Sequence, residues 1–187
     1  MPRAENPSVS VPSDVAVPTP ETLCFLLAPL GLSVIAACRR LSGGASQESW
    51  RIDGTAPDGS PESFVLRRTP AATWNFDLAA GIETEAGLMR LAGAAGVPSP
   101  AVAALLDGTE GLGRGFVMGF VAGETLGHKI VRDPAFAAVR PALAGQCGRV
   151  LAAIHGIDAD GVPGLRLQTA EAQVAALADL HAGGGWV

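Results

Sequence analysis

The most constraining feature of the chain is a series of three predicted strands joined only by short turns. The predicted strands are 34–41, 48–53 and 63–69. In the second strand Trp50 and Ile52 alternate with polar neighbours, which is typical of a strand with one buried face. Parallel neighbours need a crossover connection of a dozen or more residues, and these connections are too short to supply one. The first half of the chain is therefore predicted to form an antiparallel meander.

Helical patterns precede and follow these strands. The other predicted elements are a helix at 20–28, a helix at 82–95, strands at 101–106 and 115–121, a long amphipathic helix at 136–154 and a helix at 170–180. The two later strands are joined by a connection that includes Gly111, Gly113 and Gly115. The sequence therefore predicts an α+β fold: a five-stranded antiparallel sheet with one packed helix, followed by the beginning of an all-helical region.

Composition and charge exclude several classes of protein. The net charge of −5 and the pI of about 5.1 give no basic surface for nucleic acid. Cys24, Cys38 and Cys147 stand far apart without metal-site spacing, which fits a reducing cytoplasm. The uncharged segment 23–38 falls short of the roughly 20 residues that a membrane-spanning helix needs. Segment 1–20 lacks the features of a secretory signal and is predicted to be a flexible tail.

A glycine-rich turn lies between the first two predicted strands. It contains Gly43, Gly44, Ala45 and Ser46. Glycines let backbone N–H groups approach an oxyanion without Cβ clashes, and Ser46 adds a hydroxyl donor, so the turn is a candidate phosphate cradle. A Gly-Gly pair that serves turn geometry alone is the alternative. A Walker-type loop and a dinucleotide fingerprint are both excluded, because neither spacing is present and no helix begins at the turn.

The third predicted strand carries a candidate nucleotide-binding surface. Alternation along the strand puts Phe64 and Leu66 on one face and Val65 and Arg67 on the other. If Phe64 and Leu66 pack toward the helix-side core, Val65 and Arg67 face the side to which the glycine turn projects. An apolar surface beside a cation suits a purine base and its phosphates. The alternative is that Arg67 and Arg68 are solvated strand charges.

The helix predicted at 82–95 provides a partner for that cation. Four apolar residues form one arc of the helix: Ile82, Leu88, Met89 and Ala92. Glu85 falls near the centre of this arc, whereas Glu83 and Arg90 project elsewhere. A carboxylate within an apolar face is costly unless it is paired, and Arg67 is the natural partner. Lateral hydrogen bonds would then aim the Arg67 guanidinium at the phosphates. A purely structural ion pair gives the same pattern.

Taken together, these segments resemble the aminoglycoside phosphotransferase/choline kinase-like family, whose fold is related to protein kinases. The resemblance runs in order through LSGGASQ at 41–47, FVLRR at 64–68, ETEA at 83–86, GVPSP at 96–100, FVMGFVAG at 116–123 and LAAIH at 151–155. Arg67 stands where kinases usually have Lys, a form similar to the branch linked to acyl-CoA dehydrogenases. Gly119 stands where the family commonly has an acidic residue.

The resemblance implies a fold and a set of site residues. It implies a kinase-like nucleotide-binding N-lobe at 21–121, followed by the hinge exit and the first helices of an incomplete helical C-lobe at 122–187. ATP is the implied cofactor, with Mg²⁺ expected for the full-length family member. The implied nucleotide contacts are the glycine turn, Val65, Arg67 with its orienting partner Glu85, and the hinge residues Met118, Phe120 and Val121.

The family's catalytic segments have no match in the chain. No HGDxxxxN-type loop follows Val121, and HGID at 155–158 directly follows the predicted helix without an Asn at the required offset. No catalytic or metal-binding residue is therefore predicted, and the chain is expected to be truncated and to bind nucleotide at most. A small-molecule hydroxyl substrate is expected only for a complete protein, and self-association through an uncovered helical surface is also expected. A non-catalytic interaction module and an unrelated α+β domain are the alternatives.

Overall fold

The computed structural model describes residues 17–41, 47–69, 81–165 and 169–182. The elements up to the end of the sheet are α1 (Pro20–Leu27), η1 (Ala28–Leu30), β1 (Val34–Arg40), β2 (Glu48–Thr55), β3 (Pro61–Arg68), α2 (Ile82–Ala94), β4 (Val102–Asp107) and β5 (Arg114–Gly119). The later elements are α3 (Gly127–Arg132), η2 (Pro134–Phe136), α4 (Arg140–His155) and α5 (Ala170–Ala182). The predicted α+β class is confirmed.

The five strands form one antiparallel sheet in the order β1-β2-β3-β5-β4. The first three strands are the predicted meander. After β3 the chain passes through α2 to the far edge of the sheet, where β4 runs, and β5 returns between β4 and β3. In this register Val65 pairs with Met118 and Arg67 pairs with Phe116, so each pair shares a face of the sheet.

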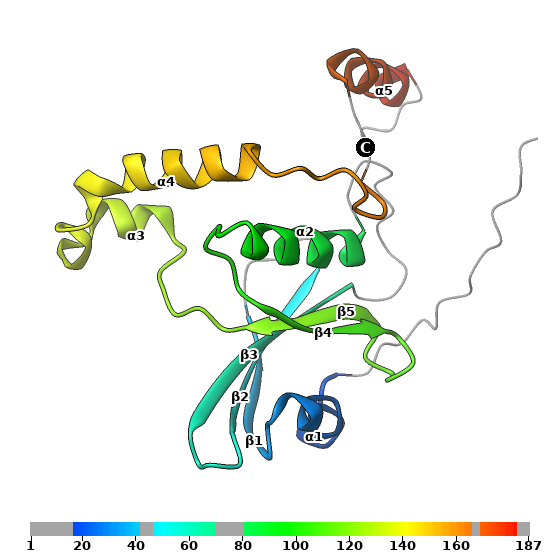
Figure 1. Cartoon of the computed structure of the whole chain (residues 1–187), viewed down its shortest axis with the longest axis vertical. Coiled ribbons are helices and arrows are strands. Elements are labelled where there is room, and N and C mark those ends of the chain that lie inside the picture. Colours follow the sequence, from blue (N-terminus) through cyan, green and yellow to red (C-terminus); the bar gives the residue numbers. More distant parts are fainter. Residues whose placement is uncertain (1–16, 42–46, 70–80, 166–168, 183–187) are drawn as a thin grey trace, which may run out of the picture.

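Helices cover both faces of the sheet, whereas the sequence predicted one packed helix (Figure 1). On one face the α1 residues Leu23 and Leu27 are fully buried in a core that includes Leu66. On the other face Ile82 and Ala86 of α2 pack with Phe116. Phe64 and Leu66 therefore face α1, so the condition that they pack toward the helix at 82–95 is not met. Because neighbouring residues alternate, Val65 and Arg67 lie on the α2 face.

Local chemistry sets the ends of α1. The Thr19 hydroxyl accepts a hydrogen bond from the Thr22 N–H, and Pro20 occupies the first helical position, where its missing N–H costs nothing. The 3-10 turn η1 continues the helix to Gly31, which adopts φ +89° and so reverses the chain toward β1.

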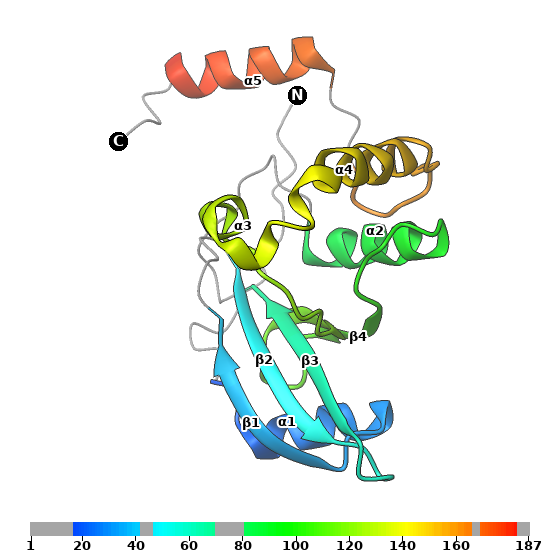
Figure 2. The same cartoon turned by 90° about the vertical axis from the view of Figure 1, so that its left-hand side faces the viewer.

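The helical region begins beyond the sheet and lies on the α2 side, where α4 runs above α2 in Figures 1 and 2. The predicted start of the long helix at Phe136 is wrong, because α4 begins at Arg140. Pro141 explains the difference: it lacks an N–H and is tolerated in a first helical turn but not inside a helix. The sequence also gave no indication of α3.

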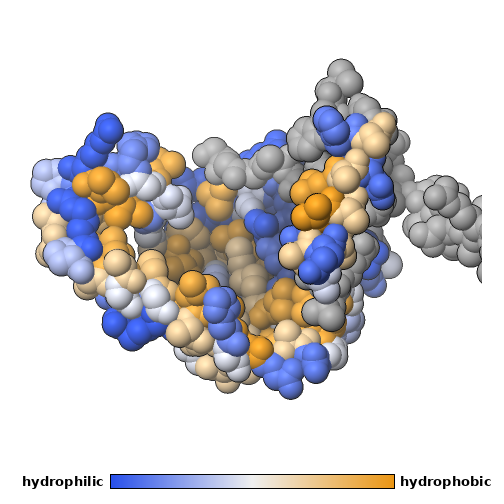
Figure 3. Space-filling view, turned by 90° about the horizontal axis from the view of Figure 1, so that it is seen from above, coloured by the Kyte–Doolittle hydropathy of each residue, from blue (hydrophilic) through white to orange (hydrophobic). Residues whose placement is uncertain are grey.

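Neither α3 nor α4 has a buried residue among its described positions. Large apolar side chains of the helical region are exposed instead: Val131, Val139, Leu151, Ile154, Val174 and Leu177. Apolar patches are visible on the face viewed in Figure 3. In the part of the chain that the structure describes, no helix combines the length and the hydrophobicity needed to cross a membrane.

Candidate functional site

An ion pair between the sheet and α2 forms the centre of the candidate site. The Nε atom of Arg67 on β3 lies 2.8 Å from Oε1 of Glu85 on α2. The pair predicted from the sequence is therefore present. Both side chains are partly exposed, at 33% for Arg67 and 31% for Glu85, so the pair lies at the rim of the α2 interface. The prediction that Glu85 lies at the centre of a buried arc is wrong, since Ile82, Thr84 and Ala86 are the buried residues of α2.

The contact between Arg67 and Glu85 is ionic rather than a directed hydrogen bond. The Arg67 Nε is buried, and no acceptor among the described residues meets it at a hydrogen-bonding angle. The short distance still gives an electrostatic attraction, which the solvent at the rim partly screens. The predicted lateral hydrogen bonds are thus not formed at Nε. The carboxylate nevertheless holds the base of the guanidinium and leaves its outer N–H donors for an oxyanion.

A second ion pair also links the sheet to α2. Arg114 Nε on β5 donates to Glu83 Oε1 on α2 at 2.7 Å, and both side chains are more exposed than Arg67 and Glu85. The two pairs lie along the same helix and have the same chemistry. The Arg114–Glu83 pair therefore provides an internal comparison for any function assigned to Arg67.

Arg68 has a different environment from its neighbour Arg67. Its side chain is 3% exposed, and its Nε and Nη2 atoms lie 3.0 and 2.9 Å from Glu48 Oε2. Its Nη1 donates to the Leu112 carbonyl at 3.1 Å, and its guanidinium lies 5.8 Å from the Trp50 ring centroid. Arg68 is therefore part of the core on the α1 face. The alternative of two solvated strand charges is wrong for Arg68.

The carboxylate of Glu48 links three strands. Besides Arg68 on β3, it contacts Arg40 on β1 at 3.1 Å and accepts a hydrogen bond from the Trp50 indole at 3.2 Å. Desolvation by burial raises the pKa of Glu48, but the hydrogen bonds from Trp50 and Arg68 and the charges of Arg68 and Arg40 outweigh it, so the pKa is lowered. Glu48 is consequently held as a carboxylate at the end of the β1–β2 pair that adjoins the connecting turn.

The predicted phosphate cradle falls in the connection between β1 and β2. Gly43, Gly44, Ala45 and Ser46 are outside the described residues, and their role stays a prediction. The residues on either side of this connection are hydrogen-bonded to each other. Leu41 donates its N–H to the Ser49 carbonyl at 2.8 Å, which closes the hairpin next to the Arg40–Glu48 contact.

The predicted base-binding residues lie along β3 and at the end of β5. Val65 is buried and pairs with Met118 on the α2 face, beside Arg67. Phe120 uses its N–H to bond the Ser63 carbonyl at 3.0 Å, so this donor is already occupied. Val121 is 68% exposed. The structure thus brings Val65, Met118 and Arg67 onto one surface, and the contact of each residue with a base stays a prediction.

Arg51 is a residue of this surface that the sequence reasoning missed. It pairs with Val65 across β2 and β3, and its guanidinium lies 3.9 Å from the centroid of the Phe120 ring. Asp53 fixes it by accepting from Arg51 Nε at 2.7 Å and from the Ser63 hydroxyl at 2.6 Å. The Ser63 hydrogen bond is the main cause of the lowered pKa of Asp53. The alternation that buries Ile52 could have indicated that Arg51 faces the α2 side.

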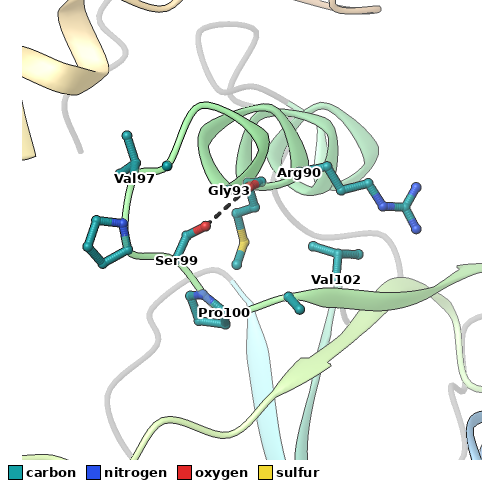
Figure 4. A pocket seen from close by; sticks show the side chains of 10 residues that line it. Arg90, Gly93, Val97, Ser99, Pro100 and Val102 are labelled. Atoms are coloured by element: carbon teal, nitrogen blue, oxygen red, sulfur yellow. Dashed lines mark hydrogen bonds between the residues drawn. The ribbon is translucent and has the colours of Figure 1, made fainter.

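A cavity of about 520 Å³ lies at the C-terminal end of α2, away from Arg67. Met89 and Gly93 of α2 and residues 96–102 line it, and the Ser99 hydroxyl donates to the Met89 carbonyl at 3.3 Å (Figure 4). Met89 and Val102 also pack with Met118 in the core under α2. The cavity therefore adjoins the surface that carries Val65 and Met118. The sequence indicated a helix exit here but no cavity.

Metal binding has no support from a cluster of ligands. The described residues contain no group of three or more His, Cys, Asp or Glu side chains that could hold a metal ion. The chemistry that the described site offers is therefore a guanidinium beside an apolar strand surface. This combination suits an anion that is attached to an aromatic or apolar group.

The sheet, the helix across one of its faces and the strand-to-helix Arg–Glu pair together define the N-terminal lobe of a kinase-like fold. The chain matches the model of the Phosphotransferase enzyme family over residues 37–183, well over half of its length. It belongs to this family. Searches of curated proteins and of solved structures gave no significant match.

Proposed function

We propose that the sheet and α2 form the ATP-binding part of a phosphotransferase that acts on the hydroxyl group of a small molecule. The observation that carries the proposal is the 2.8 Å contact between Arg67 and Glu85. In kinase-type phosphoryl transfer a cation on the third strand binds the phosphates and a Glu on the adjacent helix orients it. Membership of the Phosphotransferase enzyme family supports the same reading.

The proposed contacts follow the surface on the α2 side of the sheet. Arg67 neutralises the phosphates, and Glu85 holds it in position. Val65 and Met118 cover the base, with Phe120 and Val121 at its edge. Gly43, Gly44, Ala45 and Ser46 supply backbone and hydroxyl donors above the phosphates. The Mg²⁺ that accompanies ATP neutralises phosphate charge, and we assign it no protein ligand.

We propose that this chain binds ATP without catalysing measurable transfer. Phosphoryl transfer of this type uses an Asp that accepts the hydroxyl proton and Asp and Asn side chains that hold magnesium. The sequence contains no HGDxxxxN segment that would supply them. We also propose a cytoplasmic location, which the three free cysteines support.

Nucleotide titration of matched variants tests the proposal. We expect Mg-ATP to raise the melting temperature of the purified chain and to bind measurably in calorimetry. Arg67→Ala removes the phosphate-binding cation, so we expect it to abolish both signals. Arg114→Ala removes the same charge from the neighbouring strand-to-helix pair and should leave both signals unchanged. Equal losses in the two variants would show that general positive charge, rather than the Arg67 position, binds the nucleotide.

A further inference from the structure

The turn that follows α4 makes a partly buried contact with the first turns of α2. The Thr84 hydroxyl donates to the Pro163 carbonyl at 2.8 Å, across 79 positions of sequence. Thr84 is only 5% exposed, although it lies next to two partly exposed glutamates. One helical turn further along, Gly87 faces Val162 so closely that a Cβ on Gly87 would lie 3.7 Å from the Val162 side chain. Residues 162–164, called here the 162–164 turn, therefore contact α2 at two successive turns of the helix.

The contact depends on a glycine. Gly164 has φ +77°, and a Cβ at this position would lie 2.5 Å from the Thr84 hydroxyl oxygen. A larger residue would therefore strain the backbone and would have to displace the Thr84 hydroxyl. The turn is also closed internally, since the Val162 N–H donates to the Ala159 carbonyl and the Leu165 N–H donates to the Val162 carbonyl. A fixed backbone thus presents the Pro163 carbonyl to Thr84.

Among the described residues, no side chain caps the first turn of α2. Gly81, its N-cap, has no side chain to accept a hydrogen bond from the first turn. The Thr84–Pro163 hydrogen bond fixes this turn from outside the helix instead. Glu85 is the next residue, and its carboxylate is the group that contacts Arg67. A displacement of the first turn would therefore move Glu85 relative to Arg67.

We propose that the 162–164 turn is a positioning element that holds the first turn of α2 and thereby sets Glu85 against Arg67. The helical region then controls the geometry of the phosphate-binding cation without touching the nucleotide. The effect on nucleotide affinity rests on the proposed function, whereas the effect on α2 does not. The two parts are therefore measured separately.

Amide hydrogen exchange of the nucleotide-free chain tests the effect on α2. The probe is the Glu85 N–H, which donates to the Gly81 carbonyl at 3.0 Å in the first turn. We expect Gly164→Ala and Thr84→Val to accelerate its exchange about tenfold or more through local opening. Gly161→Ala is the matched control, because Gly161 has φ +86° but nothing lies within 4 Å of its Cβ position. Unchanged exchange in Thr84→Val, or equal acceleration in Gly161→Ala, would overturn the proposal.

Mg-ATP affinity tests the link to Arg67. We expect Gly164→Ala to weaken binding about fivefold or more and Gly161→Ala to leave it unchanged. In an Arg67→Lys background, which keeps a cation but changes its geometry, the loss caused by Gly164→Ala should be smaller, because residues that act through one contact are not additive. Faster exchange with unaltered affinity would overturn the link to Arg67. Absence of ATP binding in the unmutated chain would refute the proposed function, and the exchange rates would still decide the role of the turn.

Discussion

Arg67 and Arg68 are neighbours in sequence, but strand alternation gives them opposite environments. Arg67 faces α2 at the rim of the sheet, where its charge is available to a ligand. Arg68 is enclosed by Glu48, the Leu112 carbonyl and the Trp50 ring. Substitution of Arg68 therefore acts on folding, because it removes a buried guanidinium from the core and leaves the partly buried Glu48 carboxylate with only Arg40 and the Trp50 indole. We expect Arg68→Ala to lower the melting temperature while the folded fraction keeps its response to Mg-ATP.

The ion pair of Glu48 and Arg68 predicts a specific dependence of stability on pH. Glu48→Gln should lower the free energy of unfolding by about 3 kcal/mol at pH 7, because it removes the carboxylate charge that lies 2.9 Å from the buried Arg68 guanidinium. The pKa of Glu48 is lowered in the folded state, so its carboxylate stabilises the fold above the unfolded pKa of about 4.3, and this contribution is lost as the pH falls through the lower folded pKa. Urea unfolding of both proteins from pH 7 to pH 3 measures the difference.

We expect the stability gap between the unmutated chain and Glu48→Gln to stay constant above about pH 5 and to narrow below about pH 4. Glu62→Gln changes an exposed carboxylate on β3 and is the control for a general effect of charge removal. A gap that remained constant down to pH 3 would mean that the charge of Glu48 does not stabilise the fold.

The sequence predicted part of the site at this scale. The Arg67–Glu85 pair could be predicted because a strand cation and a helix carboxylate in apolar surroundings require each other. The position of Glu85 at the rim of the α2 interface could not be predicted. Periodicity gives the direction in which a side chain points, but not the width of the surface that covers it. The contacts of Arg51 with Phe120 and of Thr84 with Pro163 join residues far apart in sequence, and no local pattern indicates them.

At the scale of whole elements, α1 has more structural importance than the sequence suggested. It buries one face of the sheet, and its Leu23 is fully buried among core residues. We expect Leu23→Ala to lower the free energy of unfolding by about 3 kcal/mol, since it leaves a cavity in a closely packed core. Phe25→Ala on the same helix should change it by less than about 0.5 kcal/mol, because Phe25 is 86% exposed. Denaturant unfolding measures the free energy of unfolding of both variants. Similar losses in the two would mean that Leu23 is not part of the core.

Most elements were predicted to within two residues, as was the antiparallel meander of β1, β2 and β3, whereas the place of β5 in the sheet was not predicted. Turn residues and periodicity are local, so they locate strands and helices well. The position of β5 between β3 and β4 depends on which edge of the β4–β5 hairpin docks, and both edges can form hydrogen bonds. Gly115 shows the same limit. Local pattern places it both in the hairpin connection and at the start of the strand predicted at 115–121. It lies in β5, where a Cβ would clash with the Arg67 carbonyl.

At the scale of the whole molecule, the two halves of the chain bury their apolar residues to different extents. The sheet with α1 and α2 encloses two apolar clusters. The helical region exposes large apolar side chains, among them Leu151 and Ile154 on α4 and Val174 on α5. Exposed apolar side chains that gather in patches favour association. The chain is therefore predicted to self-associate through the helical region.

Sedimentation velocity over a range of protein concentrations tests this prediction. We expect the average mass of the chain to rise with concentration, and the double variant Leu151→Ser/Ile154→Ser to reduce this rise without lowering the melting temperature, because both side chains are about half exposed. Phe25→Ser removes an exposed aromatic ring from α1, on the opposite face of the sheet, and should leave association unchanged. If Phe25→Ser reduced association as much as the α4 variant, the contact between copies would involve α1 as well. If the average mass did not depend on concentration, the prediction of self-association would be wrong, and the chain would be a monomer with an exposed α4 face.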